Sequence, residues 1–194
     1  LLHGKRGIKI VTLRKISQYV KYPLNEIDKR VLKISHLKSK LLFNLNTPAG
    51  AEIRAAFLSD GHNNKNPTSG PQYYALEKEL HTKLIKLCMI VFGNFKTKTV
   101  FINKTYKTHF PAALGTALEL SGVPRGSKQL SNCYIPRDIL FSNKQIQTAY
   151  LRRCFDDEGD VCFDSHGKRA VRLTRSVDIT NKYNFENISS GRWF

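Results

Sequence analysis

The sequence predicts an α+β protein built from two similar halves, and two observations carry that prediction. Hydrophobic residues make up 41% of the 194 residues, which is enough material for a packed core. A pattern of a helix, an acidic residue followed by glycine, and two strands also occurs twice along the chain. The acids of the two patterns, Asp60 and Glu158, lie about 100 residues apart, which indicates two related halves rather than a solenoid of short repeats.

The first pattern begins after Thr47-Pro48, where a helix is expected over 51–58 with its apolar residues on one side. This helix is expected to end at Asp60-Gly61, with Gly61 in the left-handed conformation. Apolar spacing then predicts two more helices and two strands: helices over 76–92 and 111–120, and strands over 95–102 and 104–109, before a linker over 124–136.

The second pattern is a helix over 145–156 that ends at Glu158-Gly159, followed by strands over 161–163 and 170–174. The chain thus divides into a basic N-terminal extension, a first half and a second half that is shorter than the first: residues 1–48, 49–136 and 137–194. Within the extension, a strand is expected over 7–13 and a helix over 25–41.

The charge predicts a polyanionic partner. Thirty-two Lys and Arg against fifteen Asp and Glu leave a net charge of +17, which favours binding to nucleic acid. No apolar run is long enough to cross a membrane, and no basic amphipathic helix suited to a membrane surface is readable. The four cysteines form no Cys-x-x-Cys pair, so reduced thiols and a cytoplasmic location are expected.

The two helix ends align residue by residue. In Ile53–Gly61 and in Leu151–Gly159, the eighth residue is an acid and the ninth is glycine. If the helices pack side by side, both acids emerge at one end of the pair, where their repulsion favours a divalent cation between them. For either pair alone an ordinary exposed helix end is the simpler interpretation. The duplication favours a metal site, as does an acidic cluster in an otherwise basic chain: Asp156, Asp157, Glu158, Asp160 and Asp164.

These two stretches resemble the LAGLIDADG motif of homing endonucleases. Three further segments are similar to the part of the chain that closes the first half in archaeal-type members: residues 110–115, 121–128 and 134–136. The resemblance covers residues 49–176 and indicates a single-chain, two-motif member encoded in an intron or intein. It implies two pseudo-symmetric αββαββα LAGLIDADG halves, with the motif helices packed at the centre and the antiparallel sheets forming a DNA-binding saddle.

The resemblance also implies the site. Asp60 and Glu158 would bind the metal, the backbone carbonyls of Ser59 and Asp157 are further candidate ligands, and Lys128 would lie near the scissile phosphate. The expected cofactor is Mg²⁺, with Mn²⁺ as a substitute and Ca²⁺ binding without turnover. The family has a small residue where this chain has Arg153, so Arg153 is expected to point out of the helix seam or to loosen it.

The expected activity is site-specific, metal-dependent hydrolysis of both strands of a long DNA target by a monomer. Strand residues are expected to read the DNA: Lys96, Lys98, Lys104, Lys107, Lys168, Arg169, Arg172 and Arg175. The histidines lack metal-ligand spacing and are interpreted as surface or turn residues: His62, His81, His109 and His166. The alternatives are an RNA maturase that assists its host intron RNA, and a DNA-binding regulator that does not cleave.

Overall fold

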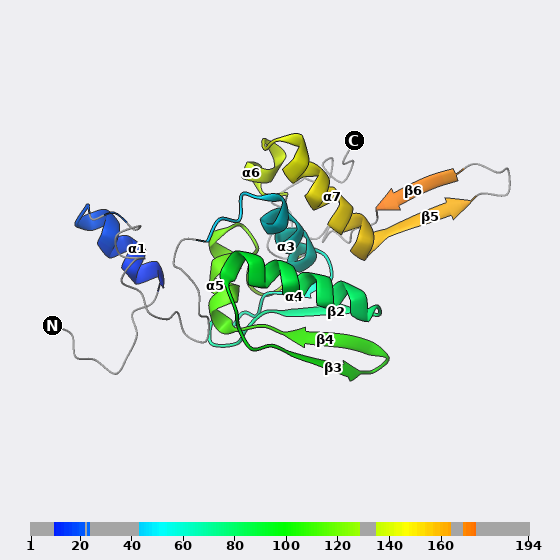
Figure 1. Ribbon diagram of the computed structural model, residues 1–194, viewed down its shortest axis with the longest axis horizontal. Helices are drawn as coiled ribbons and strands as arrows, with labels where there is room; N and C mark the ends of the chain where they lie inside the picture. The colour runs from blue at the N-terminus through cyan, green and yellow to red at the C-terminus, as the bar shows by residue number, and fades with distance from the viewer. Residues whose placement is uncertain (1–9, 22, 24–42, 129–134, 164–168, 174–194) are drawn as a thin grey trace, which may run out of the picture.

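The computed structural model describes residues 10–21, 23, 43–128, 135–163 and 169–173. In these ranges helices are combined with antiparallel sheets, so the predicted α+β class is confirmed (Figure 1). None of the helices within them is long and apolar enough to span a membrane.

The basic N-terminal segment contains helix α1 (Ile10–Tyr19), so the strand expected over 7–13 is wrong over residues 10–13, the part that the structure describes. A short apolar run does not distinguish a strand from a helix, and here Ile10, Leu13 and Ile16 recur at a helical spacing that continues past the run. The helix expected over 25–41 lies outside the described residues.

Helix α3 (Pro48–Leu58) is the centre of the described structure. Its first turn is capped by Thr47, whose Oγ1 accepts a hydrogen bond from Gly50 N at 3.1 Å. Every residue from Gly50 to Leu58 is buried, so this helix is surrounded on all sides and not on the single side that its apolar spacing predicted. Helices α4 (Lys78–Phe92) and α7 (Lys144–Glu158) both pack against it.

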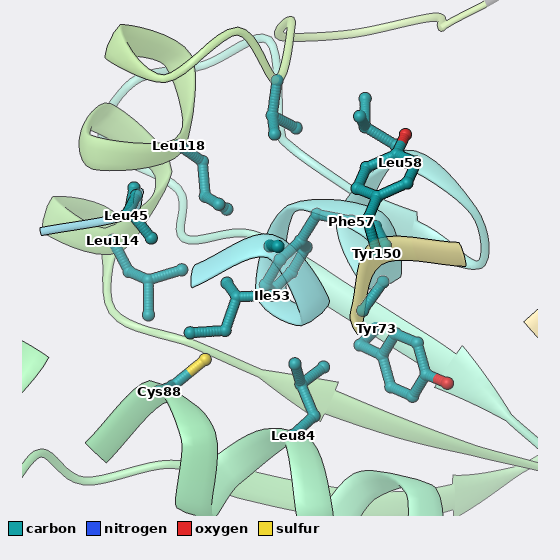
Figure 2. Close-up of a cluster of buried hydrophobic side chains, with 14 of the residues drawn as sticks. Leu45, Ile53, Phe57, Leu58, Tyr73, Leu84, Cys88, Leu114, Leu118 and Tyr150 are labelled. Atoms are coloured by element: carbon teal, nitrogen blue, oxygen red, sulfur yellow. The ribbon is translucent and has the colours of Figure 1, made fainter. Parts of the chain in front are cut away.

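The hydrophobic core is built around α3 (Figure 2). Ile53 and Phe57 of α3 meet side chains from α4, from α5 (Ala112–Leu120) and from α7: Leu84 and Cys88, Leu114 and Leu118, and Tyr150. Salt bridges tie the same helices together at the rim, because Lys83 Nζ of α4 lies 3.1 Å from Glu52 Oε2 of α3 and 3.5 Å from Asp156 Oδ2 of α7.

Four short strands form one antiparallel sheet: β1 (Gly61–His62), β2 (Gln72–Ala75), β3 (Lys98–Ile102) and β4 (Thr105–His109), in the order β1-β2-β4-β3. Helix α4 lies over one face of this sheet (Figure 1). The predictions of β3 and β4 are confirmed, as are those of α4 and α5. Strands β1 and β2 were not predicted, because two and four residues are too few to show a period of two.

A second unit of helix and strands follows the linker. The short helix α6 (Arg137–Leu140), which was not predicted, is joined to α3 through Arg54 Nη1 and Asp138 Oδ2 at 2.6 Å. Helix α7 and the antiparallel strands β5 (Gly159–Phe163) and β6 (Arg169–Leu173) confirm the second predicted pattern. The β5–β6 hairpin runs outward from the end of α7 (Figure 1).

The glycines that end α3 and α7 are required for close packing and not for a left-handed turn. Gly61 lacks a positive φ, and Gly159 has φ −81°, so the left-handed conformation expected at Gly61 is wrong. A Cβ at Gly61 would lie 2.5 Å from Phe57 Cα, and one at Gly159 would lie 2.6 Å from Phe155 O. Each glycine therefore packs against a phenylalanine four residues earlier, and each begins a strand.

We predict that Gly61→Ala and Gly159→Ala each lower the free energy of unfolding by about 2 kcal/mol, because the added methyl group overlaps backbone atoms of the preceding turn. Urea denaturation followed by circular dichroism measures the change. Thr148→Ala, at an exposed position of α7, is the control and is expected to leave stability nearly unchanged. Parent-like stability of both glycine variants would contradict the close-packing explanation.

Candidate functional site

The ends of α3 and α7 are held together by strand β2. The two helices pack side by side, which was the condition for their acids to emerge at one end of the pair. On β2, Tyr74 N donates to the carbonyl oxygen of Asp60 at 3.3 Å, and the neighbouring Tyr73 hydroxyl donates to Asp157 Oδ1 at 2.7 Å. One short strand therefore contacts the acidic ends of both helices.

Asp60 lies at the end of α3 among two cations and a second acid. Burial raises the pKa of its carboxyl above the usual value, while the charges of Lys128 and Arg153 oppose the increase and that of Glu77 adds to it. Lys128 Nζ donates a hydrogen bond to the carbonyl oxygen of Ser59. The structure thus brings Lys128 beside Asp60, and its ammonium group engages the carbonyl that was expected to bind metal.

Arg153 is fully buried and does not point out to solvent. Its Nε lies 3.2 Å from Asp157 Oδ2, and its Nη2 lies 3.1 Å from Asp157 Oδ1. Nη2 also donates to the Tyr73 hydroxyl, and the guanidinium lies 4.9 Å from the centre of the Tyr73 ring. Arg153 was expected to point out of the helix seam or to loosen it. Its side chain stays inside the protein and turns to Tyr73 of β2 and to Asp157 of its own helix. These two residues engage Nε and Nη2, whereas Nη1 has no hydrogen-bond partner among the described residues.

Asp157 is the acid of α7 that interacts with Asp60. Burial raises the pKa of Asp157 to about 7, against the opposing effects of Arg153 and of the Tyr73 hydrogen bond, and the nearby charge of Asp60 raises it further. Glu158 is the last residue of α7 and is half-buried. Sequence reasoning did not identify Tyr73 or the Asp157 carboxylate as parts of the site, although the alternation in Gln72–Ala75 would have placed Tyr73 on the inner face of a strand.

The donor set at these helix ends suits a cation that also binds a phosphate. The described residues contain no group of three or more His, Cys, Asp or Glu side chains arranged to hold a metal ion. Mg²⁺, however, commonly takes only one or two carboxylates and completes its coordination with water and substrate phosphates. Carboxylates at the ends of two adjacent helices fit that requirement, without forming a closed cage.

The face of the four-stranded sheet that α4 leaves uncovered is mostly polar and basic, with two aliphatic residues on its outer strand. Strand pairing and the period of two place these residues on it: His62, Gln72, Tyr74, Lys98, Val100, Ile102, Thr105, Lys107 and His109. Lys107 Nζ lies 5.2 Å from the centre of the Tyr74 ring, a cation–π contact between neighbouring strands. The four strands, which the structure describes in full, contain no acidic residue.

The residues predicted to contact DNA lie on different elements of the structure. Lys98 and Lys107 lie on the open sheet face, Lys96 precedes β3, and Lys104 lies in the tight turn between β3 and β4. On the β5–β6 hairpin, Arg169 and Arg172 are exposed, and Arg172 Nη2 pairs across the strands with Asp160 Oδ2 at 3.1 Å. Lys168 and Arg175 lie outside the described residues.

His81 lies in the interior between the sheet and α4, so its interpretation as a surface residue is wrong. Its side chain is 1% exposed, and Nδ1 lies 2.6 Å from Thr108 Oγ1, which in turn lies 2.8 Å from Thr99 Oγ1. Its ring also packs against the Tyr73 ring, edge to face, with 4.9 Å between the centroids. His81 thus packs against Tyr73, the residue whose hydroxyl binds Asp157.

Comparison with protein-family models and with curated proteins found no match for this chain. Its function is therefore inferred from the residues of the site and of the open sheet face.

We predict that acid weakens the fold through His81. Burial lowers the pKa of His81, so below pH 6.5 the unfolded chain binds a proton that the folded protein accepts only at lower pH. The stability contributed by His81 is consequently lost as the pH drops below about 6.5. Asp157, whose pKa burial raises to about 7, acts in the opposite direction over the same range. Denaturation of the parent and of His81→Gln at pH 7.5 and pH 5.5 isolates the His81 contribution, because the parent is expected to lose more stability, or to gain less, than the variant.

The control is His109→Gln, at an exposed position of the same sheet. Partial burial also lowers the pKa of His109, but because its side chain is exposed, this variant is expected to respond to pH more like the parent than His81→Gln does. An equal loss in the parent and in His81→Gln would show that other groups cause the acid sensitivity.

Proposed function

We propose that this chain is a site-specific DNA endonuclease of the LAGLIDADG homing type, which hydrolyses phosphodiester bonds with a divalent cation. The observation that carries the proposal is the packing of α3 against α7, with their acidic ends joined through β2. The order of elements from α3 to α5 supports it, because helix, two strands, helix, two strands and helix is the order implied for one half by the resemblance. The second pattern, α7-β5-β6, begins in the same way.

The proposed substrate is double-stranded DNA, bound on the open sheet face. That face carries lysines, amide and imidazole groups and a tyrosine, which can contact phosphates and base edges in the major groove. The absence of acids from the four strands favours a polyanion there. The exposed Arg169 on the β5–β6 hairpin would extend the basic surface, whereas Arg172 is partly neutralised by Asp160.

The proposed cleavage centre lies at the helix ends. Asp60 and Glu158 would hold Mg²⁺, which supplies a Lewis acid that activates water and stabilises charge on the phosphate. Lys128, beside Asp60, would donate to the attacked phosphate oxygen and stabilise the negative charge that develops there. Water adds to phosphorus, and the phosphorus–O3′ bond breaks to leave a 3′-hydroxyl and a 5′-phosphate.

A second candidate function is nucleic-acid binding without cleavage, as an RNA maturase or a regulator. Two observations favour it. Lys128 engages the Ser59 carbonyl, and Arg153 and Tyr73 engage the Asp157 carboxylate, so several oxygens of the centre already have protein partners. A binder of this kind needs the sheet face but not a metal between the helix ends.

We predict that Asp60→Asn and Glu158→Gln each reduce double-strand cleavage by about 100-fold or more, because a neutral amide is a poor ligand for Mg²⁺. Binding measured by gel shift with Ca²⁺ is expected to persist. The assay is cleavage of a plasmid that carries a target selected by binding. Asp160→Asn, an exposed acid beyond the motif, is the control and is expected to cleave like the parent.

Parent-like cleavage by either motif variant would exclude the shared metal site. A parent protein that binds DNA or intron RNA tightly but cuts no target would favour the second candidate function.

We also predict that the open sheet face makes the phosphate contacts. Lys98→Ala and Lys107→Ala are each expected to reduce the slope of log K against log salt by about 0.9, the value for one phosphate contact. Fluorescence anisotropy over a salt series measures the slope. Lys86→Ala, exposed on the helix that covers the other face, is the control and is expected to leave the slope unchanged. Equal slopes in all three variants would place the nucleic acid elsewhere.

A further inference from the structure

The charged side chain of Arg153 is buried where α3, α7 and strand β2 come together. The side chains of Arg153 and Asp157 are both 0% exposed. A buried ion is tolerated only when an opposite charge and hydrogen bonds replace the water that it has lost. Here Oδ2 of Asp157 accepts a hydrogen bond from Arg153 Nε, while Oδ1 accepts one from the Tyr73 hydroxyl and lies 3.1 Å from Arg153 Nη2 as an ion pair. Both carboxylate oxygens are therefore engaged by protein donors.

A second cation stands at the same helix ends. Lys128 Nζ donates a hydrogen bond to the carbonyl oxygen of Ser59, the residue before Asp60. Tyr74 N on β2 binds the carbonyl oxygen of Asp60, while the adjacent Tyr73 binds Asp157, so the two acids lie at the same end of the helix pair. Two fixed cations thus stand beside two carboxylates that would otherwise repel each other at the helix ends.

We propose that Arg153 is the resident countercharge of Asp157, and that it keeps the Asp157 carboxylate out of the set of metal ligands. The ends of α3 and α7 can then pack together without a metal cation between Asp60 and Asp157. This inference deepens the proposed function and rests on its metal site, since it states which carboxylate that site does not use. It makes Arg153 a positioning residue, which acts through Asp157.

The test is the number of Mn²⁺ ions bound per chain, measured by electron paramagnetic resonance, together with the melting temperature in EDTA and in Mn²⁺. In Arg153→Met, Asp157 loses its buried cation. The melting temperature in EDTA is expected to fall by about 10 °C. Mn²⁺ is expected to raise it by more than in the parent, and one additional Mn²⁺ is expected to bind.

The double variant Arg153→Met/Asp157→Asn removes both charges. It is expected to regain most of the melting temperature in EDTA and to bind the same number of Mn²⁺ ions as the parent. Arg152→Met, the exposed neighbour on α7, is the matched control and is expected to match the parent in both measurements. If Arg153→Met yields no folded protein, the double variant still carries the test.

Three results would overturn the inference. They are an equal Mn²⁺ count in Arg153→Met and the parent, an additional ion that persists in the double variant, and a double variant that binds one ion fewer than the parent. The last result would show that Asp157 is a ligand in the parent. Failure of the proposed endonuclease is separate, because it would appear as absent cleavage by the parent while these differences in Mn²⁺ count remain.

Discussion

The buried charges at the ends of α3 and α7 are the constraint on which the rest of the structure depends. α3 is buried on all sides, and Asp60, two residues beyond its end, is half-buried. Lys128 and Arg153 provide positive charge beside Asp60, and Tyr73 and Arg153 satisfy Asp157. Because α4 is also tied to both helices through Lys83, the three helices form one unit around these charges.

One face of the four-stranded sheet packs toward the three helices, and the other face points away from them. On the inner face, Tyr73 reaches Asp157, while His81 and Thr108 form a hydrogen-bonded layer beneath it. On the outer face, Lys98 and Lys107 stand in a surface without acids. Because neighbouring side chains of a strand point to opposite faces of the sheet, a few residues suffice both to contact the interior and to form the exposed basic face.

The two helix ends share a closely packed glycine and differ in where the helix stops and in their chemistry. Helix α3 ends at Leu58, two residues before Asp60, whereas α7 continues through Glu158. Gly61 and Gly159 are packed in the same way against the preceding helical turn. The cation at the α3 end is Lys128, supplied from a distant loop, whereas α7 carries its own cation, Arg153, one turn before the acid that it pairs with. Because of this asymmetry, the acids at the two helix ends are not in equivalent surroundings, although a tightly packed glycine follows each helix.

The sequence by itself determined the α+β class, most helices, the longer strands and the alignment of the two acid-glycine ends, because these depend on local periodicity and on caps. It misplaced the strand at 7–13 and missed β1 and β2, which are too short to have a period. The environment of Arg153, His81 and Asp157 was decided only by the tertiary structure. Whether a charged side chain is buried depends on the partners that distant segments bring to it, and Tyr73 reaches Asp157 from 84 residues away in the chain.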